Sequence, residues 1–167
     1  MIMDTLKQYI ELCWFRNNPL ELRRSVSLFK QNLLFSYIIE FLMQANMTDD
    51  PLESFYEVTI ETFLTLLFIA IMLFFNKTVY AYVQVATAIL VCANTVSLFI
   101  VPVAVWLTVS EDALSYYVLS LLLLWDYALV TYIVKQTLSI NIAASVAVSF
   151  LYFSVTYFGA FALGQII

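Results

Sequence analysis

The 167-residue chain contains no histidine, only two glycines and three prolines, and very few charged residues. Without imidazole there is no histidine-ligated zinc or haem, and no Ser-His or Cys-His catalysis. No glycine-rich phosphate loop is present, so nucleotide chemistry is not expected. We therefore predict a protein that is not an enzyme and that uses no cofactor and no metal.

Charged residues are also scarce. Charged residues make up 11% of the chain and hydrophobic residues 63%, whereas a soluble domain carries about 25% charged residues. A water-soluble protein this apolar could not cover its own surface, so the bilayer must be the solvent for most of the chain. Spans of about 20 residues each then leave no room for a separate soluble domain.

Continuous apolar runs, without the period-two alternation of a membrane β-barrel, predict the architecture. We expect an all-α polytopic transmembrane helical bundle over residues 25–167, preceded by a cytoplasmic amphipathic segment at 1–24. Pro102 interrupts the long run from Val79 to Val109, which predicts that the third span ends near residue 100. A kink or a short interfacial piece carrying Trp106 should follow. The five predicted spans are about 25–46, 55–75, 79–100, 114–134 and 140–163.

The N-terminal segment reads as an amphipathic helix over residues 4–16, with one apolar face that includes Tyr9, Cys13 and Trp14. It either lies in the membrane interface or packs on the protein's own cytoplasmic face. Asn18 is placed to cap a new helix starting at Pro19, which we expect to continue without interruption into the first span. Because Cys13 should be cytoplasmic and Cys92 should lie inside a span, we do not expect the two cysteines to pair.

Basic residues determine the predicted orientation. With five spans, one side of the membrane carries every basic residue: Lys7, Arg16, Arg23, Arg24, Lys30, Lys77 and Lys135. The other side carries only acids: Asp49, Asp50, Glu53, Glu111 and Asp112. The positive-inside rule then predicts a cytoplasmic N-terminus and an outside C-terminus. Arg16, Arg23, Arg24 and Lys30 either contact anionic lipid headgroups or only set this topology.

Acidic side chains within the spans are the candidate functional residues, because charge at bilayer depth is costly. Matching depths predict a polar cluster of Glu40, Glu61 and Asn94, with Glu57 one turn further out. No basic residue can neutralise this cluster, so at least one carboxyl should be protonated or bound to a cation. Asp126 should lie at the depth of Gln84 and Thr87, which share a helix face with Asn94.

Three roles for these side chains remain open: hydrogen bonds between helices, proton or ion transport, and binding of a partner's helix. The plan of the chain resembles the bacterial Yip (Ypt-interacting protein) family in its Phe15-Arg16-Asn17-Asn18-Pro19 stretch, the long helix after it and the proline in the third span. The resemblance implies five spans and a bacterial inner-membrane location with the N-terminus cytoplasmic.

From these features we predict a non-enzymatic assembly, scaffold or accessory subunit of another membrane component. Its expected partners are membrane lipids and another membrane protein or a second copy of itself, but not nucleic acid. The alternative is a small transporter, channel or lipid-handling protein that uses the intramembrane carboxylates.

Overall fold

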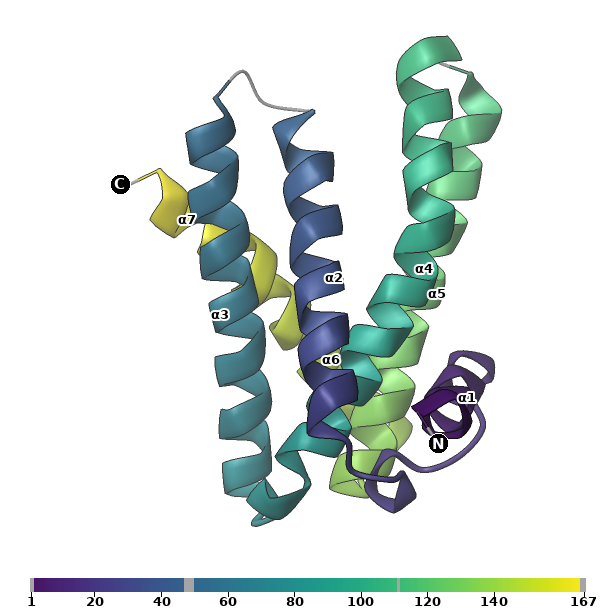
Figure 1. Ribbon diagram of the computed structural model, residues 1–167, viewed down its shortest axis with the longest axis vertical. Coiled ribbons are helices and arrows are strands. Elements are labelled where there is room, and N and C mark those ends of the chain that lie inside the picture. The colour runs from purple at the N-terminus through teal and green to yellow at the C-terminus, as the bar shows by residue number, and fades with distance from the viewer. Residues whose placement is uncertain (1, 47–49, 111, 166–167) are drawn as a thin grey trace.

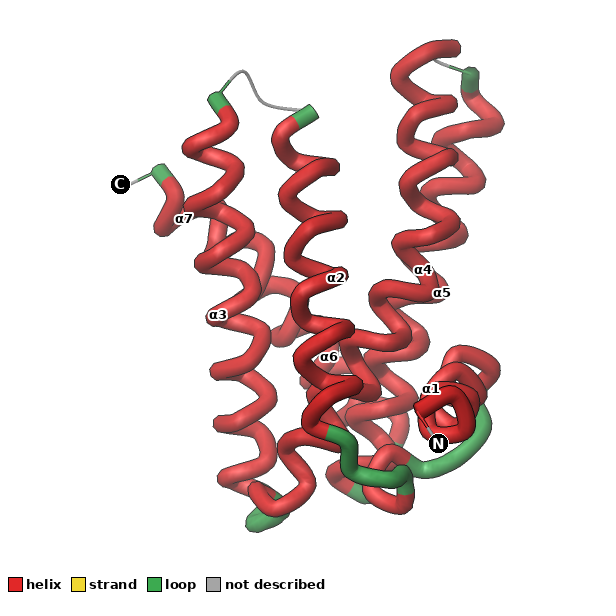
Figure 2. The backbone as a smooth tube through the Cα atoms, in the orientation of Figure 1, coloured by secondary structure: helices red, strands yellow, loops and turns green. Residues whose placement is uncertain are grey.

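The computed structural model describes residues 2–46, 50–110 and 112–165, and every regular element in these ranges is helical (Figures 1 and 2). The all-α class is thereby confirmed; Asp49 and Glu111, two of the predicted outer acids, lie outside the described residues. The elements are α1 (Ile2–Ile10), η1 (Glu11–Trp14), η2 (Pro19–Glu21), α2 (Val26–Ala45), α3 (Pro51–Phe75), η3 (Val79–Ala81), α4 (Tyr82–Ser110), α5 (Ala113–Leu138), α6 (Ile142–Phe153), the π-helical turn η4 (Ser154–Phe158) and α7 (Gly159–Gly164).

Short polar caps begin most of the long helices. In α2, α3, α5 and α6 the residue before the helix, Ser25, Asp50, Asp112 or Asn141, accepts a hydrogen bond of 2.8–3.2 Å from a backbone N–H in the first turn. Such caps satisfy donors that the helix itself cannot pair. Left-handed residues after α3 and α5, Lys77 (φ 59°) and Ser139 (φ 53°), then reverse the chain tightly.

Four stretches of the described residues are long and apolar enough to cross a membrane: Pro51–Phe75, Val79–Ser110, Ala113–Leu138 and Ile142–Gly164. The chain is therefore consistent with an integral membrane protein. The predicted first span, α2, is 20 residues long but is not among the four. Polar residues such as Lys30, Asn32 and Glu40 lower its mean hydropathy.

The helices form two groups that separate toward one end. Figure 1 shows α2 beside α3 and α4 beside α5, while the last segment runs obliquely from α6, behind α2, to α7, behind α3. From Ser97 to Ser110 no residue of α4 is buried, whereas nine of the ten residues from Val85 to Asn94 are buried. The core therefore occupies the half of the bundle near the start of α4, and the other half of the α4–α5 pair diverges from α2 and α3 (Figure 1).

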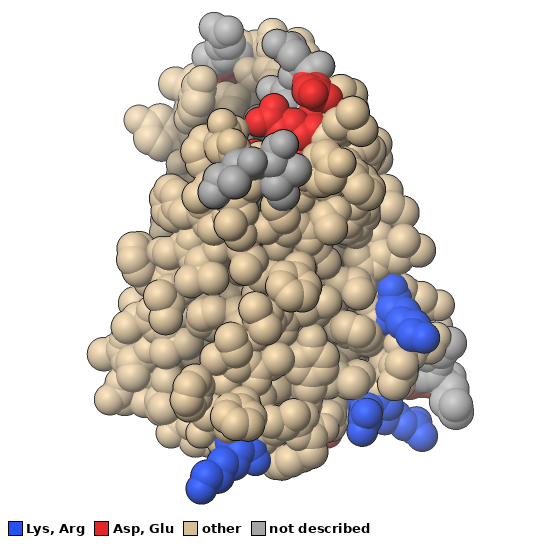
Figure 3. Space-filling view, turned by 90° about the vertical axis from the view of Figure 1, so that its left-hand side faces the viewer, with Lys and Arg blue, Asp and Glu red and all other residues tan. Residues whose placement is uncertain are grey.

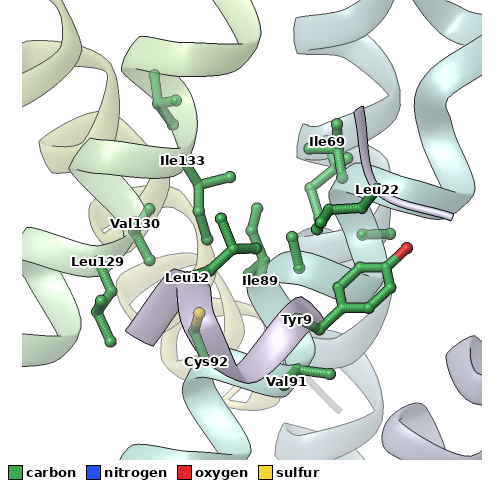
Figure 4. Packing of buried hydrophobic residues seen from close by; sticks show 14 of the residues in the cluster. Tyr9, Leu12, Leu22, Ile69, Ile89, Val91, Cys92, Leu129, Val130 and Ile133 are labelled. Atoms are coloured by element: carbon green, nitrogen blue, oxygen red, sulfur yellow. The ribbon is translucent and has the colours of Figure 1, made fainter. Parts of the chain in front are cut away.

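The N-terminal segment packs against this core. Tyr9, Leu12 and Cys13 are all but completely buried, and Figure 4 shows Tyr9 and Leu12 among residues of α4 and α5. The Tyr9 hydroxyl donates to the backbone oxygen of Arg23 (3.0 Å), and burial raises the pKa of Tyr9 to about 12, so this donor stays protonated. Of the two predicted settings, packing on the protein itself is the one observed.

One expectation about helix continuity was wrong. The chain from Pro19 forms only the single 3₁₀ turn η2, because Leu22 is extended (ψ 149°) and Ser25 caps α2 separately. At Pro102 the predicted alternatives were a kink or a short interfacial piece; α4 forms no separate piece but continues as one helix through Pro102 to Ser110. A proline removes one backbone hydrogen bond, but a break would expose several unpaired groups to lipid, so continuing the helix costs less.

The charges are segregated along the bundle. On the face shown in Figure 3, basic side chains gather toward the lower end and acidic side chains near the upper end, with a wide uncharged band between. Such a band between charged ends is the surface expected of a chain embedded in a bilayer.

Candidate functional site

Three of the four intramembrane acids surround one small cavity. Glu40 of α2, Glu61 of α3 and Asp126 of α5 line it, although they are far apart in the sequence. Its volume is about 40 Å³, enough to hold a few water molecules. The remaining lining comes from the same helices, α4 and the α6–η4 segment: Ser36, Thr65, Ile89, Leu90, Ala93, Val130, Tyr152, Phe153, Thr156 and Tyr157. All five long segments therefore contribute to one site.

Glu40 occupies the centre of this arrangement. Its Oε1 accepts a hydrogen bond of 3.0 Å from the Ser36 hydroxyl, one helical turn earlier on α2. The Glu40 carboxyl is also within electrostatic range of both Glu61 and Asp126. Three acids that interact in a low-dielectric interior cannot all carry charge without a counter-ion. No lysine or arginine lines the cavity, so protons or another cation must neutralise them.

Asp126 is a buried acid whose hydrogen bonding is incomplete. Its Oδ1 is buried and has no hydrogen-bond partner among the described residues. A buried polar atom without a partner is uncommon in folded proteins and usually marks a function or a bound water or ion. Asp126 also lines the cavity, which offers space for a water molecule to donate a hydrogen bond to this oxygen.

A ladder of carboxyls leads along α3 toward the cavity. Glu53, Glu57 and Glu61 are spaced four residues apart, which places them on one face, each about 6 Å beyond the last. The outermost, Glu53, accepts a hydrogen bond of 3.1 Å from Gln165 Nε2. Glu57 lies against Gly164, where a Cβ atom would be only 2.9 Å from Glu57 Cγ. The absence of a side chain at Gly164 therefore leaves room for Glu57.

The other polar residues predicted for the site lie elsewhere. Asn94 is buried but does not line the cavity; its amide donates to the backbone oxygen and to Oδ1 of Asn32, at 3.0 and 3.1 Å. Thr87 donates to the backbone oxygen of Val83 (2.6 Å). The buried Oε1 of Gln84 has no hydrogen-bond partner among the described residues. The structure thus joins Glu40 and Glu61 to Asp126 rather than to Asn94.

The N-terminal segment brings the two cysteines together, contrary to expectation. Cys13 Sγ and Cys92 Sγ are 3.6 Å apart, in hydrogen-bond contact, and both thiols are free. Trp125 Nε1 donates to the backbone oxygen of Cys13 (3.3 Å). The expected separation was wrong because the segment lies against α4 and α5 rather than apart from the spans. The predicted headgroup residues Arg16, Arg23, Arg24 and Lys30 are all exposed, and their lipid contact stays a prediction.

Several cavity residues were not anticipated from the sequence. Ser36 could have been found, since it lies four residues before Glu40 on one helix face. Thr156 and Tyr157 gave no signal, because they lie in the π-helical turn from Ser154 to Phe158, which changes the direction of their side chains. Tyr152 precedes this turn in α6 and also gave no signal. Among the described residues, no three His, Cys, Asp or Glu side chains are arranged to hold a metal ion.

Comparison with known proteins provides no assignment: the chain matches no known protein family, no curated protein and no solved structure. The resemblance to the Yip family therefore stays a prediction.

Proposed function

We propose that this chain is a small, non-enzymatic membrane protein that conducts protons through the carboxyls of Glu40, Glu61 and Asp126. One observation carries the proposal: three acids from three helices surround one cavity that has no basic residue in its lining, and Asp126 Oδ1 lacks a protein partner. Intramembrane carboxyls of this kind mark proton relays in pumps and transporters. Purely structural acids would be expected to have their oxygens paired with neighbouring helices.

The proposal includes five spans, with α2 as the first. Its 20 residues give a length of about 30 Å, equal to the hydrocarbon core of a bilayer. The basic side chains toward one end of the molecule in Figure 3 favour a cytoplasmic N-terminus. Following the Yip resemblance, we place the protein in the bacterial inner membrane.

The ladder on α3 supplies a route from outside. In this orientation Glu53 and Glu57 lie between the outer surface and Glu61, and each side chain is one helical turn from the next. Protons can pass between carboxyls at this spacing through single intervening waters. Glu57 is the connecting member, because Gly164 leaves space beside it.

Proton flux tests this proposal. It is measured in liposomes that contain the purified protein and an internal pH-sensitive dye. Wild-type protein should collapse an imposed pH gradient under a clamped potential, and Glu61→Gln and Asp126→Asn should reduce the rate to that of empty liposomes. Glu21→Gln makes the same chemical change on an exposed side chain and should conduct like the wild type. Equal flux in all four proteins, or wild-type liposomes as tight as empty ones to H⁺, Na⁺ and K⁺, would refute the proposal.

A second candidate function, assembly with another membrane protein, rests on the diverging half of the α4–α5 pair. Leu98, Val109, Leu121 and Leu124 are each at least 60% exposed there, although they belong to long helices. A partner helix, or a second copy of the chain, could cover this surface. Native mass spectrometry after gentle extraction should then detect a partner or a dimer; a monomer without a copurifying protein would contradict it.

A further inference from the structure

An apolar groove lies apart from the carboxyl cavity, beside the turn that ends α3. Four apolar residues of α3 between Phe68 and Phe75 form one wall, and Val148 and Leu151 of α6 form the other. Leu138 and Ile140, from the α5–α6 turn, close one end. The groove and the cavity share no residue, so whatever occupies the groove is independent of the proposed proton route.

The size of the groove matches one lipid chain. Its volume is about 390 Å³, within the usual range for small-molecule sites. From Phe68 to Phe75 the wall extends seven residues along α3, or about 10 Å. One leaflet of a bilayer has a hydrocarbon depth of about 15 Å. The groove therefore covers most of the depth that an acyl chain occupies in that leaflet.

The polar end of the groove carries positive charge. Asn76 is the polar residue of the lining, and its amide donates to the backbone oxygen of Thr137 (3.2 Å), which ties the end of α3 to the end of α5. Lys77 follows Asn76 directly in the left-handed turn, and Lys135 lies one helical turn before Leu138. Both lysines are exposed. Two exposed lysines are thus near in sequence to the groove residues Asn76 and Leu138.

We propose that this groove binds an anionic glycerophospholipid, with one acyl chain between α3 and α6 and the phosphate between Lys77 and Lys135. The apolar walls match the chain, and the two ammonium groups match a headgroup with net negative charge. This site is distinct from the headgroup contacts predicted for Arg16, Arg23, Arg24 and Lys30. Those residues lie in the N-terminal segment and the first turns of α2, whereas Lys77 and Lys135 are near in sequence to the groove residues Asn76 and Leu138.

Lipid titration of the purified full-length protein, followed by native mass spectrometry, tests the proposal. The probes are phosphatidylglycerol and phosphatidylcholine with identical acyl chains. Wild-type protein should bind phosphatidylglycerol more tightly. Lys77→Gln combined with Lys135→Gln should weaken that binding about thirtyfold, the effect of two lysines near a membrane surface, and should leave phosphatidylcholine binding unchanged.

Two further variants separate this groove from general surface charge. Arg23→Gln with Arg24→Gln removes two positive charges elsewhere and should change phosphatidylglycerol binding less than threefold. Val148→Phe fills the groove and should weaken binding of both lipids. Equal wild-type affinity for the two lipids, full binding by the lysine double variant, or an equal loss in the arginine variant would each overturn the proposal. Should Val148→Phe fail to fold, the charge variants still decide it.

Discussion

Replacing Asp126 with leucine should make the protein more stable while abolishing proton flux. Asp126 Oδ1 is buried without a protein partner, and such an atom costs about 1–3 kcal/mol of stability. Leucine has the same branched arrangement of four side-chain heavy atoms, its larger methyl groups can extend into the adjoining cavity, and it leaves no unpaired oxygen. It also removes one of the three acids that line the cavity. We therefore expect a gain of about 2 kcal/mol in the free energy of unfolding.

This gain in the free energy of unfolding should appear as a higher melting temperature, Tm. For chains of 150–250 residues, 1 kcal/mol shifts Tm by roughly 2–4 °C, so Asp126→Leu should raise Tm by about 4–8 °C. The native cysteines provide the reporter: Cys13 is 1% and Cys92 0% exposed, so a thiol-reactive fluorescent maleimide labels them only when the bundle unfolds. The assay is a thermal ramp in detergent with this dye, and the same variants go into the liposome assay.

Asn94→Leu is the matched control. Asn94 is also a buried polar residue in a long helix, but its amide makes two hydrogen bonds to Asn32. Its replacement should therefore lower Tm by several degrees, because the Asn32 acceptors are left without their donor. A lower Tm for Asp126→Leu, similar to that of Asn94→Leu, would mean that Asp126 is a structural residue. That result would refute both the stability argument and the functional role.

Three further predictions concern the N-terminal segment and the α3 ladder. A mild membrane-permeant oxidant should join Cys13 to Cys92, seen as a faster-migrating monomer on a non-reducing gel, since their sulfurs are 3.6 Å apart; an unchanged gel pattern, identical to that of Cys92→Ser, would contradict the packing. Tyr9→Phe should lower the free energy of unfolding by about 1 kcal/mol, through loss of the bond to Arg23, whereas no change in Tm would argue against that bond. Gly164→Ala should cost about 1 kcal/mol by crowding Glu57, and a second change, Glu57→Ala, should restore the lost stability; additive losses in this double-mutant cycle would exclude the contact.

The sequence was a good guide wherever a physical rule acts locally. Apolar runs predicted the long helices because the bilayer admits few other structures, and Asn18 caps the element that follows it, as predicted. Depth along each helix placed Glu40 and Glu61 at one level, since every residue adds a fixed rise. These inferences need only the chain's own periodicity.

Such rules could not predict the lateral arrangement of the helices. Depth does not tell which helices are neighbours, so Asn94 was assigned to the cluster in place of Asp126, and the contact between Cys13 and Cys92 was missed. The π-helical turn from Ser154 to Phe158 rotates the residues that follow it, and no sequence signal marks that turn. Pro102 was expected to end the third span. In lipid, however, a broken helix would leave backbone groups without hydrogen bonds, so a proline ends a helix less readily there than in water.

The burial of the N-terminal segment against α5 has a consequence for synthesis of the protein. The partner of the Cys13 backbone oxygen, Trp125, is made 112 residues later, or roughly 6–20 s at 5–20 residues per second. During that interval the apolar face of the segment has no core to join, and we expect it to rest on the membrane surface. In arrested nascent chains, Cys13 should become protected from maleimide only after α5 has left the ribosome; earlier protection would contradict this order. A segment made before all the spans would then reach its final place only after α5.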